Sequence, residues 1–523
     1  MSVLLSREHK ALVLPVGTGF IDSESDSQKP IGKLADGRTV LPHTPFHTRM
    51  LRAAGHDIPN PMELYYDFPG GPPFQVQRRS AEMLVENPRA YLLNQQGTGK
   101  TKTALWAWDY LNRCGEARKL LVVAKLSTLN FVWAREIDRT LLGRRAVVLG
   151  SDKGMPKAQR LKLLDDKEAD IFVINHDGLK VIHDELAART DIDTLVLDEL
   201  AVYRNNSDRA RGMRGFASRF KHVWGLTGSP MPNEVTDVWG QCKIITPHTT
   251  TKYFKSCREA LMYRVDQFTW RPKPEATERA LAMMQPSRRY SLDDVIELPD
   301  IIHRTVECAL SSEQEKAYNE FRAKLAIMVQ QKQITAANAG AMANKLLQIS
   351  GGYVYSEAPA YVCLDARPRL NLLRDLIEEN ERKVLVFAPY RHMVAEIGKF
   401  LNSKEGLGAN STAIIGDKGR DEVLFKFQDT SEYKALVSHP GPIGHGNTLT
   451  SADLIIWYSP IADYDVFDQA NFRIRRIGQA HKQQILYLVS TPAERRMYGI
   501  LRRKENIQNG FLAMVEEASR GPV

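Results

Sequence analysis

One short run of the sequence has the composition of a loop that binds phosphate groups. An apolar stretch leads into Gly97-Thr98-Gly99-Lys100-Thr101, and a helix-forming run follows it. The two glycines let the main chain approach phosphate oxygens without a Cβ clash, and the N–H groups at the helix start point at the same place. We expect Lys100 to reach the terminal phosphates and the Thr101 hydroxyl to bind Mg²⁺. The run therefore predicts a site for ATP with Mg²⁺.

This loop departs from the full phosphate-loop pattern at one position. The pattern has Gly six residues before the lysine, where this chain has Asn94. The alternative interpretation is an ordinary glycine-rich turn before a helix, with Lys100 solvated. The strand-like run before the loop and the helical run after it favour the phosphate site.

A phosphate loop also needs acidic groups, and two follow another apolar strand. Thr194–Leu197 ends in Asp198 and Glu199, about a hundred residues after the loop, with further strand-like runs between. Asp198 is a candidate to hold Mg²⁺, and Glu199 is a candidate to polarise the attacking water. A strand ending in a polar loop is the alternative interpretation of these two residues.

The elements around these residues predict an α/β fold. Short β-branched runs, bounded by turns and followed by helix-period segments, indicate buried parallel strands. The segment from about 250 to 380 is mostly helical in period, as in 313–331 and 336–349, and strand-like runs then resume. The predicted strands are 120–124, 146–149, 171–174, 194–197 and 223–226 in the first block, and 383–387, 411–415, 434–438, 454–458 and 485–489 in the second.

Length and composition set the domain organisation. The 523 residues exceed one core, and the order of elements predicts an N-terminal extension of unassigned role at 1–72, a first α/β lobe at 73–295, a mainly helical linker at 296–380 and a second lobe at 381–523. Lys and Arg exceed Asp and Glu by 71 to 62, a modest excess that permits a polyanionic partner. The five cysteines are scattered, without metal-ligand spacing, and no apolar run suits a membrane span.

The order of the motifs resembles that of the Swi/Snf-related branch of helicase superfamily two, in a compact form like that of bacterial or phage members. The most specific match is the run from Gln469 to Gln479, which ends in Arg-Arg-Ile-Gly-Gln. The chain departs from the family at Lys125, which is usually Pro, and at Ala201, which lacks the usual imidazole. Further matches are Phe74–Gln77, Leu121–Lys125 with Trp133 and Glu136, Asp198–Ala201 with Arg204 and Asn205, Leu226–Pro230 with Asn233 and Trp239, Val384–Phe387 and Gly444–Thr450.

The resemblance covers about residues 73 to 505. It implies two RecA-like lobes, with ATP in the cleft between them and nucleic acid across both. It also implies that Gln77 reads adenine, that Gly446 faces the nucleotide, and that Arg473 and Arg476 meet the charge of the transition state from the second lobe. We expect these two arginines, three residues apart, to share a helix face, with Arg475 pointing elsewhere. The implied DNA contacts are Lys125, Ser127, Asn175, His176, Gly416 and Thr450, of which His176 is equally well interpreted as a structural turn residue.

The sequence therefore predicts a DNA-stimulated ATPase that moves along double-stranded DNA and remodels DNA or protein–DNA complexes. Two alternatives stay open. One is a helicase that separates the strands of DNA or RNA, and the other is a DNA-bound scaffold that does not hydrolyse ATP, which the departures at Asn94 and Ala201 favour. The predicted cofactors are ATP and Mg²⁺, and the predicted partner is duplex DNA, with other protein factors possible and no membrane. The expected location is the cytoplasm of a bacterial or phage-infected cell, or the nucleus of a eukaryotic one.

Overall fold

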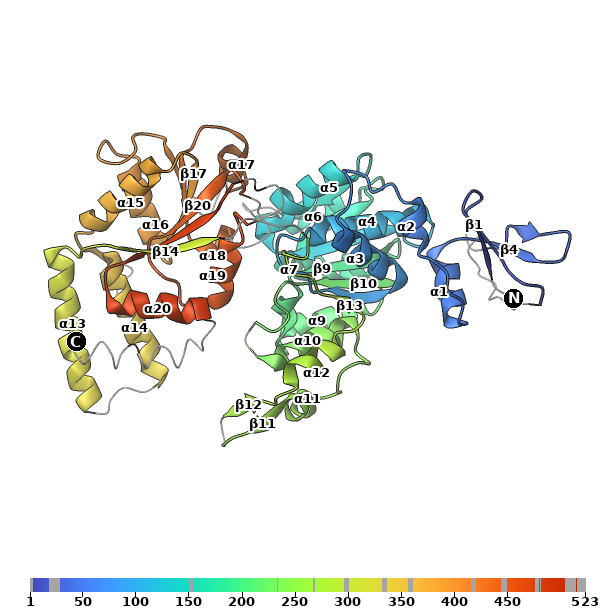
Figure 1. The fold of residues 1–523 in the computed structure, drawn as a ribbon, viewed down its shortest axis with the longest axis horizontal. Coiled ribbons are helices and arrows are strands. Elements are labelled where there is room, and N and C mark those ends of the chain that lie inside the picture. Colours follow the sequence, from blue (N-terminus) through green and yellow to red (C-terminus); the bar gives the residue numbers. More distant parts are fainter. Residues whose placement is uncertain are drawn as a thin grey trace. The chain divides into compact units, whose positions relative to one another are not determined.

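Two compact units, Met1–Ile296 and Glu297–Val523, make up the chain in the computed structural model (Figure 1). The first unit carries a small N-terminal sheet and a large parallel sheet, and the second carries another parallel sheet. The residues that the structure describes are 3–17, 29–150, 154–232, 234–266, 269–295, 301–331, 336–355, 361–414, 420–443, 449–475, 479, 481–503 and 514.

The N-terminal extension folds into an antiparallel sheet with two helices. Its strands β1 (Leu4–Ser6), β2 (Ala11–Val13), β4 (Thr39–Pro42) and β3 (Gly32–Lys33) pair in that order. Helices α1 (Pro45–Ala53) and α2 (Pro61–Tyr65) follow, and the side chains of Thr44 and Asn60 cap their first turns. The strands are two to four residues long, which is too short for a periodic pattern to appear in the sequence.

Buried polar contacts attach this extension to the rest of the first unit. The Glu116 carboxylate, with a fully buried side chain, accepts hydrogen bonds from the Phe46 N–H (2.7 Å) and from the Arg49 guanidinium (2.6 Å). Arg49 also donates to the backbone oxygen of Val85 in α3. A carboxylate removed from water needs partners of this kind, so the extension supplies a charge that the first lobe requires.

A seven-stranded parallel sheet forms the centre of the first unit. Its order is β13-β5-β10-β9-β6-β8-β7, and every pairing in it is parallel. The central strands are almost fully buried, as expected where helices cover both faces. The strands are β5 (Arg89–Leu92), β6 (Lys119–Ala124), β7 (Ala146–Val148), β8 (Ile171–Asn175), β9 (Ile192–Asp198), β10 (His222–Leu226) and β13 (Ser287–Arg288).

Alternate residues of each strand face opposite helical layers. In β6, Leu120 and Val122 belong to the core under α3, α4 and α5, whereas Leu121 and Val123 belong to the core under α6 to α12. The first layer consists of α3 (Gln75–Glu86), α4 (Lys100–Arg113) and α5 (Arg135–Thr140). The second consists of α6 (Lys157–Leu164), α7 (His176–Val181), α8 (His183–Ala187), α9 (Asp208–Ala217), α10 (Val238–Ile245), α11 (Phe254–Leu261) and α12 (Ala276–Met283).

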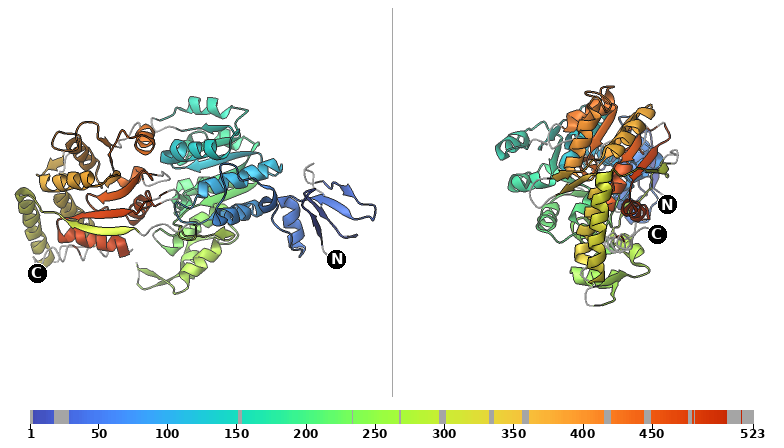
Figure 2. Two further views of the ribbon diagram at one scale, coloured as in Figure 1. Left: turned by 45° about the horizontal axis from the view of Figure 1, so that its top comes forward. Right: turned by 90° about the vertical axis from the view of Figure 1, so that its left-hand side faces the viewer.

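The second unit is built around a six-stranded parallel sheet with the order β14-β21-β20-β17-β19-β18. Its strands are β14 (Ile302–Glu307), β17 (Lys383–Phe387), β18 (Thr412–Ile414), β19 (Ala435–Ser438), β20 (Ala452–Trp457) and β21 (Gln484–Val489). Its helices are α13 (Ser312–Gln330), α14 (Ala336–Gly351), α15 (Arg367–Glu379), α16 (Arg391–Leu401), α17 (Arg420–Asp429), α18 (Pro440–Ile443), α19 (Tyr464–Asn471) and α20 (Pro492–Arg503), with a hairpin of β15 (Tyr353–Tyr355) and β16 (Tyr361–Cys363). The long rod of α13 is visible in Figures 1 and 2.

The predicted α/β class is confirmed, and so are the ten predicted strands and the two predicted helices of the central segment. The strands of the segment 296–380 were not predicted: β15 and β16 form a hairpin, and β14 pairs in parallel with β21 and belongs to the second sheet. Most of its residues are exposed because it is an edge strand, so the apolar run that marks a buried strand is absent from its sequence. The assignment of 296–380 as a linker stays a prediction.

Candidate nucleotide-binding site

The predicted phosphate loop connects the end of β5 to the start of α4. Gly97 and Gly99 have φ angles of +83° and +82°, in the left-handed region that favours glycine. Gly99 is the N-cap residue of α4, so Lys100 and Thr101 lie in the first turn of that helix. The N–H groups of a first turn have no partner inside the helix and carry partial positive charge. The backbone here therefore has the form of an anion-binding loop.

Gln77 in α3 is fixed against this loop. Its Nε2 donates to the Thr98 carbonyl oxygen at 3.1 Å, and its Oε1 accepts from the Phe74 N–H at 3.1 Å. A Cβ atom on Gly99 would lie 2.1 Å from Gln77 Nε2, so a side chain at that position would displace the Gln77 amide group. One N–H and one lone pair of the amide stay available for a ligand. The adenine-reading role of Gln77 stays a prediction, but its place beside the loop is a fact of the fold.

Asn94, the departure from the phosphate-loop pattern, has a structural role. Its side chain is buried, and its Nδ2 donates to Ser80 Oγ in α3 at 3.1 Å. Its Oδ1 accepts from the Tyr290 N–H at 3.1 Å, just beyond β13. The neighbouring Gln95 continues this contact, because its N–H donates to the Tyr290 carbonyl and its Oε1 accepts from the Leu292 N–H, both at 2.8 Å. These bonds tie the start of the loop to the segment that follows β13.

The Lys100 ammonium group lies inside the loop. Its Nζ donates to the carbonyl oxygens of Asn94 and Gln95 at 2.7 and 3.1 Å. These two bonds hold the ammonium group over the loop, and both acceptors belong to the main chain of the loop itself. A phosphate oxygen that binds Lys100 would therefore exchange with, or add to, carbonyl contacts that already position the charge.

The two predicted carboxylates stand at the end of β9, between β10 and β6 in the sheet. Asp198 Oδ2 accepts from Trp133 Nε1 at 2.8 Å, and Asp198 Oδ1 accepts from the Glu199 N–H at 3.0 Å. Burial and the neighbouring Glu199 charge raise the pKa of Asp198, while Trp133 and the Lys100 charge oppose that rise. Glu199 has a φ of +55°, an unfavourable conformation for a non-glycine residue that is often found at functional sites. The structure thus brings Lys100 within electrostatic range of the acidic pair.

The residues at this site suit a magnesium nucleotide. Mg²⁺ is usually bound through one or two carboxylates together with substrate phosphates, and Thr101 and Asp198 offer a hydroxyl and a carboxylate. Burial and the Glu199 charge raise the pKa of Asp198 despite the Trp133 bond and the Lys100 charge, so a further cation beside it would favour its ionised form. Among the described residues no group of three or more His, Cys, Asp or Glu side chains is placed to hold a metal. The ligand roles of Thr101 and Asp198 stay predictions.

The loop after β10 packs directly on the phosphate loop. The Thr227 N–H donates to the Leu92 carbonyl at 3.0 Å, and the Ser229 N–H donates to Thr227 Oγ1 at 3.2 Å. A Cβ on Gly228 would lie 3.2 Å from the side chain of Gln96 and 3.3 Å from its N atom. The Leu226–Pro230 motif is therefore in contact with the phosphate loop.

Comparison with known proteins agrees with this geometry. The SNF2-related domain model matches residues 75–353, which is more than half of the chain, and the helicase conserved C-terminal domain model matches residues 368–478. The chain belongs to the SNF2-related family. It carries the ATPase core of that family in two lobes, and the predicted resemblance is confirmed.

Several curated relatives are similar to this SNF2-related protein. Protein p41 of Acyrthosiphon pisum secondary endosymbiont phage 1 is 24% identical over 431 residues, which are 77% of this chain and 87% of the relative. An ATP-dependent helicase of Mycoplasma pneumoniae is 22% identical over 76% of this chain and 38% of its own length. A SWI/SNF-related matrix-associated actin-dependent regulator of chromatin, subfamily A-like protein 1, from Xenopus tropicalis is 23% identical over 77% of this chain.

This chain spans about two fifths of the Mycoplasma and Xenopus relatives, with 41% of the latter covered. Among solved structures, the Sulfolobus solfataricus SWI2/SNF2 ATPase core in complex with double-stranded DNA is 20% identical. That match covers 87% of this chain and 95% of the other, with a TM-score of 0.40. Within the described residues of this SNF2-related protein, no helix is both long enough and apolar enough to cross a membrane.

The predicted DNA contacts of the first lobe differ in their surroundings. The His176 ring is buried, its Nδ1 lies 2.8 Å from Tyr203 Oη, and burial lowers its pKa to about 3. A neutral ring held by Tyr203 favours the structural interpretation of His176. Asn175 packs beside Gly178 and Gly150, where an added Cβ would lie 2.4 and 3.2 Å from Asn175 Oδ1. Lys125 and Ser127 are half-buried in the segment after β6, and their DNA roles stay predictions.

In the second lobe, Arg473 lies in a turn after α19 and not on a helix. The helix ends at Asn471, and the Arg473 N–H donates to the Ala470 carbonyl at 3.1 Å. The Arg473 side chain is fully buried, and its Nε donates to the Gln469 carbonyl at 2.9 Å. The expected helix face was therefore wrong for Arg473, because α19 ends before it, and Arg476 lies outside the described residues.

Some predicted residues lie outside the part of the chain that the structure describes. These are Arg476, Gly446 and Gly416 of the second lobe and Asn233 of the first. Thr450 is described, and its Oγ1 accepts from Gln428 Nε2 in α17 at 3.4 Å. Its expected contact with DNA stays a prediction.

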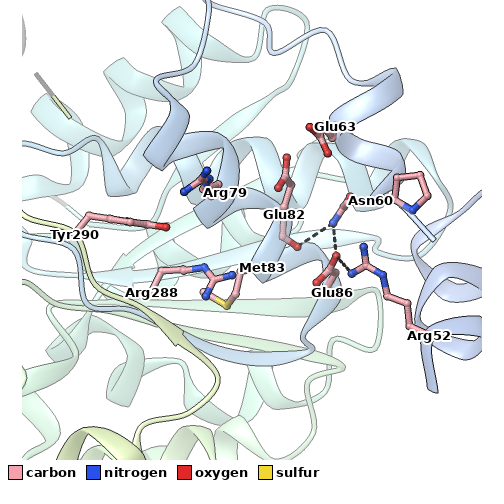
Figure 3. Close-up of a pocket in the computed structure, with 10 residues that line it drawn as sticks. Arg52, Asn60, Glu63, Arg79, Glu82, Met83, Glu86, Arg288 and Tyr290 are labelled. Carbon is pink, nitrogen blue, oxygen red and sulfur yellow. Dashed lines mark hydrogen bonds and ion pairs between the residues drawn. The ribbon is translucent and has the colours of Figure 1, made fainter. Parts of the chain in front are cut away.

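A polar pocket of about 500 Å³ lies between the N-terminal extension, α3 and the segment after β13 (Figure 3). On one side Glu86 accepts from Arg52 at 2.5 Å and from Asn60 Nδ2 at 2.7 Å. Burial, together with the charges of Glu63 and Glu86, raises the pKa of Glu82 to about 7. Sequence motifs gave no signal for this junction, because its residues come from three separate segments. The lining residues are Arg52, Pro59, Asn60, Glu63, Arg79, Glu82, Met83, Glu86, Arg288 and Tyr290.

Proposed function

We propose that this protein is a DNA-stimulated ATPase that moves along double-stranded DNA and remodels the DNA or the proteins bound to it. The observation that carries the proposal is the clustering of Lys100 with Asp198 and Glu199 beside a glycine loop in one lobe. Phosphoryl transfer needs positioning and charge neutralisation more than covalent chemistry, and these residues are of the kind that it needs.

Within the first lobe, we assign each residue a part in that reaction. The loop N–H groups and Lys100 bind the phosphates, Thr101 and Asp198 hold Mg²⁺, and Glu199 orients the attacking water and takes its proton. When bound, Mg²⁺ neutralises charge on the phosphate oxygens. Trp133 holds the Asp198 carboxylate in one orientation through its 2.8 Å hydrogen bond.

The second lobe supplies the arginines in this proposal. Arg473 and Arg476 neutralise the charge that builds on the transferred phosphoryl group, a contribution worth about 10³–10⁵ in rate where such arginines have been dissected. Because the acidic groups belong to residues 73–295 and the arginines to residues 381–523, hydrolysis requires the lobes to close. One closing and opening per ATP shifts the two lobes relative to bound DNA.

The decisive experiment measures the ATPase rate without nucleic acid and with duplex DNA, single-stranded DNA or RNA. We expect duplex DNA to give the largest stimulation, and we expect Lys100→Ala and Glu199→Gln to abolish turnover in a folded protein. Lys102→Ala is the matched control, because Lys102 lies on the same helix but donates to the Gly70 carbonyl away from the loop. Full activity in the Lys100 or Glu199 variants would refute the site.

Strand separation is a second candidate, since the Mycoplasma relatives are named ATP-dependent helicases. An unwinding assay on blunt and forked duplexes separates it from translocation alone. Displacement of a triplex-forming strand without separation of the duplex supports our proposal. Separation of the duplex strands at the rate of ATP hydrolysis supports the helicase.

A further inference from the structure

An insert between α10 and β13 projects from the first lobe. It consists of α11, a hairpin of β11 (Met262–Arg264) and β12 (Trp270–Pro272), and α12. Figures 1 and 2 show the hairpin at the end of the lobe farthest from the sheet. Its base is fixed to the core of the lobe by buried side chains, which are Cys257, Leu261, Met262, Ala276 and Ala280. The base of the insert is therefore packed into the core of the first lobe.

The register of the hairpin decides which side chains face solvent. The cross-strand pairs are Met262 with Pro272, Tyr263 with Arg271, and Arg264 with Trp270, and paired residues share a face. Met262 is buried and Trp270 packs against the lobe core, so their face is the inner one. Tyr263 and Arg271 consequently stand next to each other on the outer face. Tyr263 is 47% exposed and Arg271 is exposed.

On the inner face, aromatic and cationic side chains contact each other. Tyr263 and Arg271 on the outer face take no part in these contacts. The Arg258 guanidinium lies 4.5 Å from the Trp270 ring centroid and 5.7 Å from that of Phe254. These contacts join the inner face of the hairpin to α11. On the outer face, the Arg271 side chain has no hydrogen bond or ion pair with any described residue. Contacts among the described residues therefore do not account for an exposed tyrosine beside an exposed guanidinium.

The charge of the insert indicates a polyanionic partner. Residues 252–273 contain six Lys or Arg against two Asp or Glu, and five aromatic residues. Tyr253, at the start of the insert, is 63% exposed, with Lys252 Nζ 5.3 Å from its ring centroid. Aromatic rings interleaved with cations suit a nucleic acid strand, since the rings stack on bases while the cations bind phosphates. A duplex hides its bases from such rings, so the rings favour an unpaired strand.

We propose that the outer face of the β11–β12 hairpin binds single-stranded nucleic acid, with Tyr263 stacking on a base and Arg271 binding a phosphate. This inference rests on the proposed function and refines its substrate class. The substrate is then a duplex that carries an unpaired strand, and the hairpin of the first lobe holds that strand.

The test measures binding of the full chain to a fluorescent oligothymidylate of about twenty nucleotides, which exceeds the site size of a single stacking platform. We expect Tyr263→Ala to weaken this binding about tenfold, and Tyr263→Phe to retain it because the ring is kept. Arg271→Ala should reduce the dependence of log affinity on log salt by about 0.7, the value for one phosphate contact on a single strand. Arg279→Ala is the matched control, since Arg279 is exposed on α12 of the same insert but is paired with Glu275 at 3.1 Å.

ATPase stimulation by blunt duplex DNA, measured on the same proteins, separates this inference from the proposed function. We expect it to be unchanged in the Tyr263 and Arg271 variants, and Lys100→Ala should lose turnover while keeping oligothymidylate binding. Equal oligothymidylate binding by the wild type and a Tyr263→Ala/Arg271→Ala double variant overturns the hairpin site and leaves the ATPase proposal intact. An equal loss in Arg279→Ala also overturns it, because the effect would then follow net charge alone.

Discussion

The two parallel sheets are built alike but differ at the carboxyl ends of their strands. In the first lobe, β5 leads into the phosphate loop and β9 ends in the half-buried Asp198. In the second lobe, β17 and β20 end in the fully buried Phe387 and Trp457. The residues directly after β20 and β21, Tyr458 and Ser490, bond to Arg369, which forms a fully buried ion pair with Glu494 at 2.7 Å. Among the described residues, one architecture thus carries a glycine loop with carboxylates in one lobe and a buried ion pair closed on itself in the other, so the residues after each strand decide the chemistry.

The difference also extends to how the charged groups are held. Lys100 is held by carbonyl groups of its own loop, whereas Arg473 is fully buried in a turn and bonded to the carbonyl of Gln469. The first lobe therefore has a site that is organised by itself. In the second lobe, Arg473 lies in a turn after α19 and not directly after a strand.

The largest expected effect tests the contribution of the second lobe. Replacing Arg473 with Ala should lower the DNA-stimulated ATPase rate by about 10³, because the transition-state charge loses its partner. Binding of a fluorescent ATP analogue should persist, since the first lobe holds the phosphates. Arg475→Ala is the control from the same turn. A normal rate in Arg473→Ala, with a low rate in Arg475→Ala, would reverse the assignment of the two arginines.

A smaller effect is expected when a side chain is added to the phosphate loop where the loop contacts α3. In Gly99→Ala the new Cβ would meet Gln77 Nε2, and the φ of +82° would cost about 1–2 kcal/mol for a residue with a side chain. We expect ATP affinity to fall about tenfold or more, measured by titration with the analogue. Gly212→Ala is a fair control, because a Cβ there meets no atom within 4 Å. Unchanged affinity in Gly99→Ala would mean that the loop rearranges when it binds nucleotide.

A substitution of Asn94 tests whether contacts within the first lobe hold the phosphate loop in place. It changes no predicted catalytic group. Asn94→Gly restores the common phosphate-loop residue but removes the buried bonds to Ser80 and Tyr290. We expect the free energy of unfolding to fall by about 2 kcal/mol, measured by urea denaturation, and the ATPase rate not to rise. A more stable or faster variant would show that Asn94 is a defect of the loop and would revive the scaffold alternative.

The smallest effect concerns the pocket beside the N-terminal extension. The pKa of Glu82 is raised to about 7 in the folded protein, so its protonated form contributes stability at low pH that is lost as pH rises through that value. Glu82→Gln keeps an uncharged side chain at every pH. The variant should therefore gain in Tm relative to the wild type by up to a few degrees near pH 8, but not near pH 4. A difference in Tm that does not vary with pH would place the Glu82 pKa at its ordinary value.

The sequence by itself determined the phosphate loop, the acidic pair and the ten buried strands of the two sheets. Each of these depends on local spacing: a glycine loop before a helix, carboxylates after an apolar run, or a β-branched run between turns. Such patterns can be detected in a single sequence because residues close together along the chain produce them. The family, too, could be recognised from the order of these local motifs.

Only the tertiary structure decided how these parts are held. It placed Asn94 against Tyr290, Glu116 against Arg49, and Tyr263 beside Arg271 on an exposed face. It also ended α19 before Arg473 and added β14, an exposed edge strand, to the second sheet. These features join residues from distant segments or depend on what covers a strand, and the local pattern of a sequence carries no record of either.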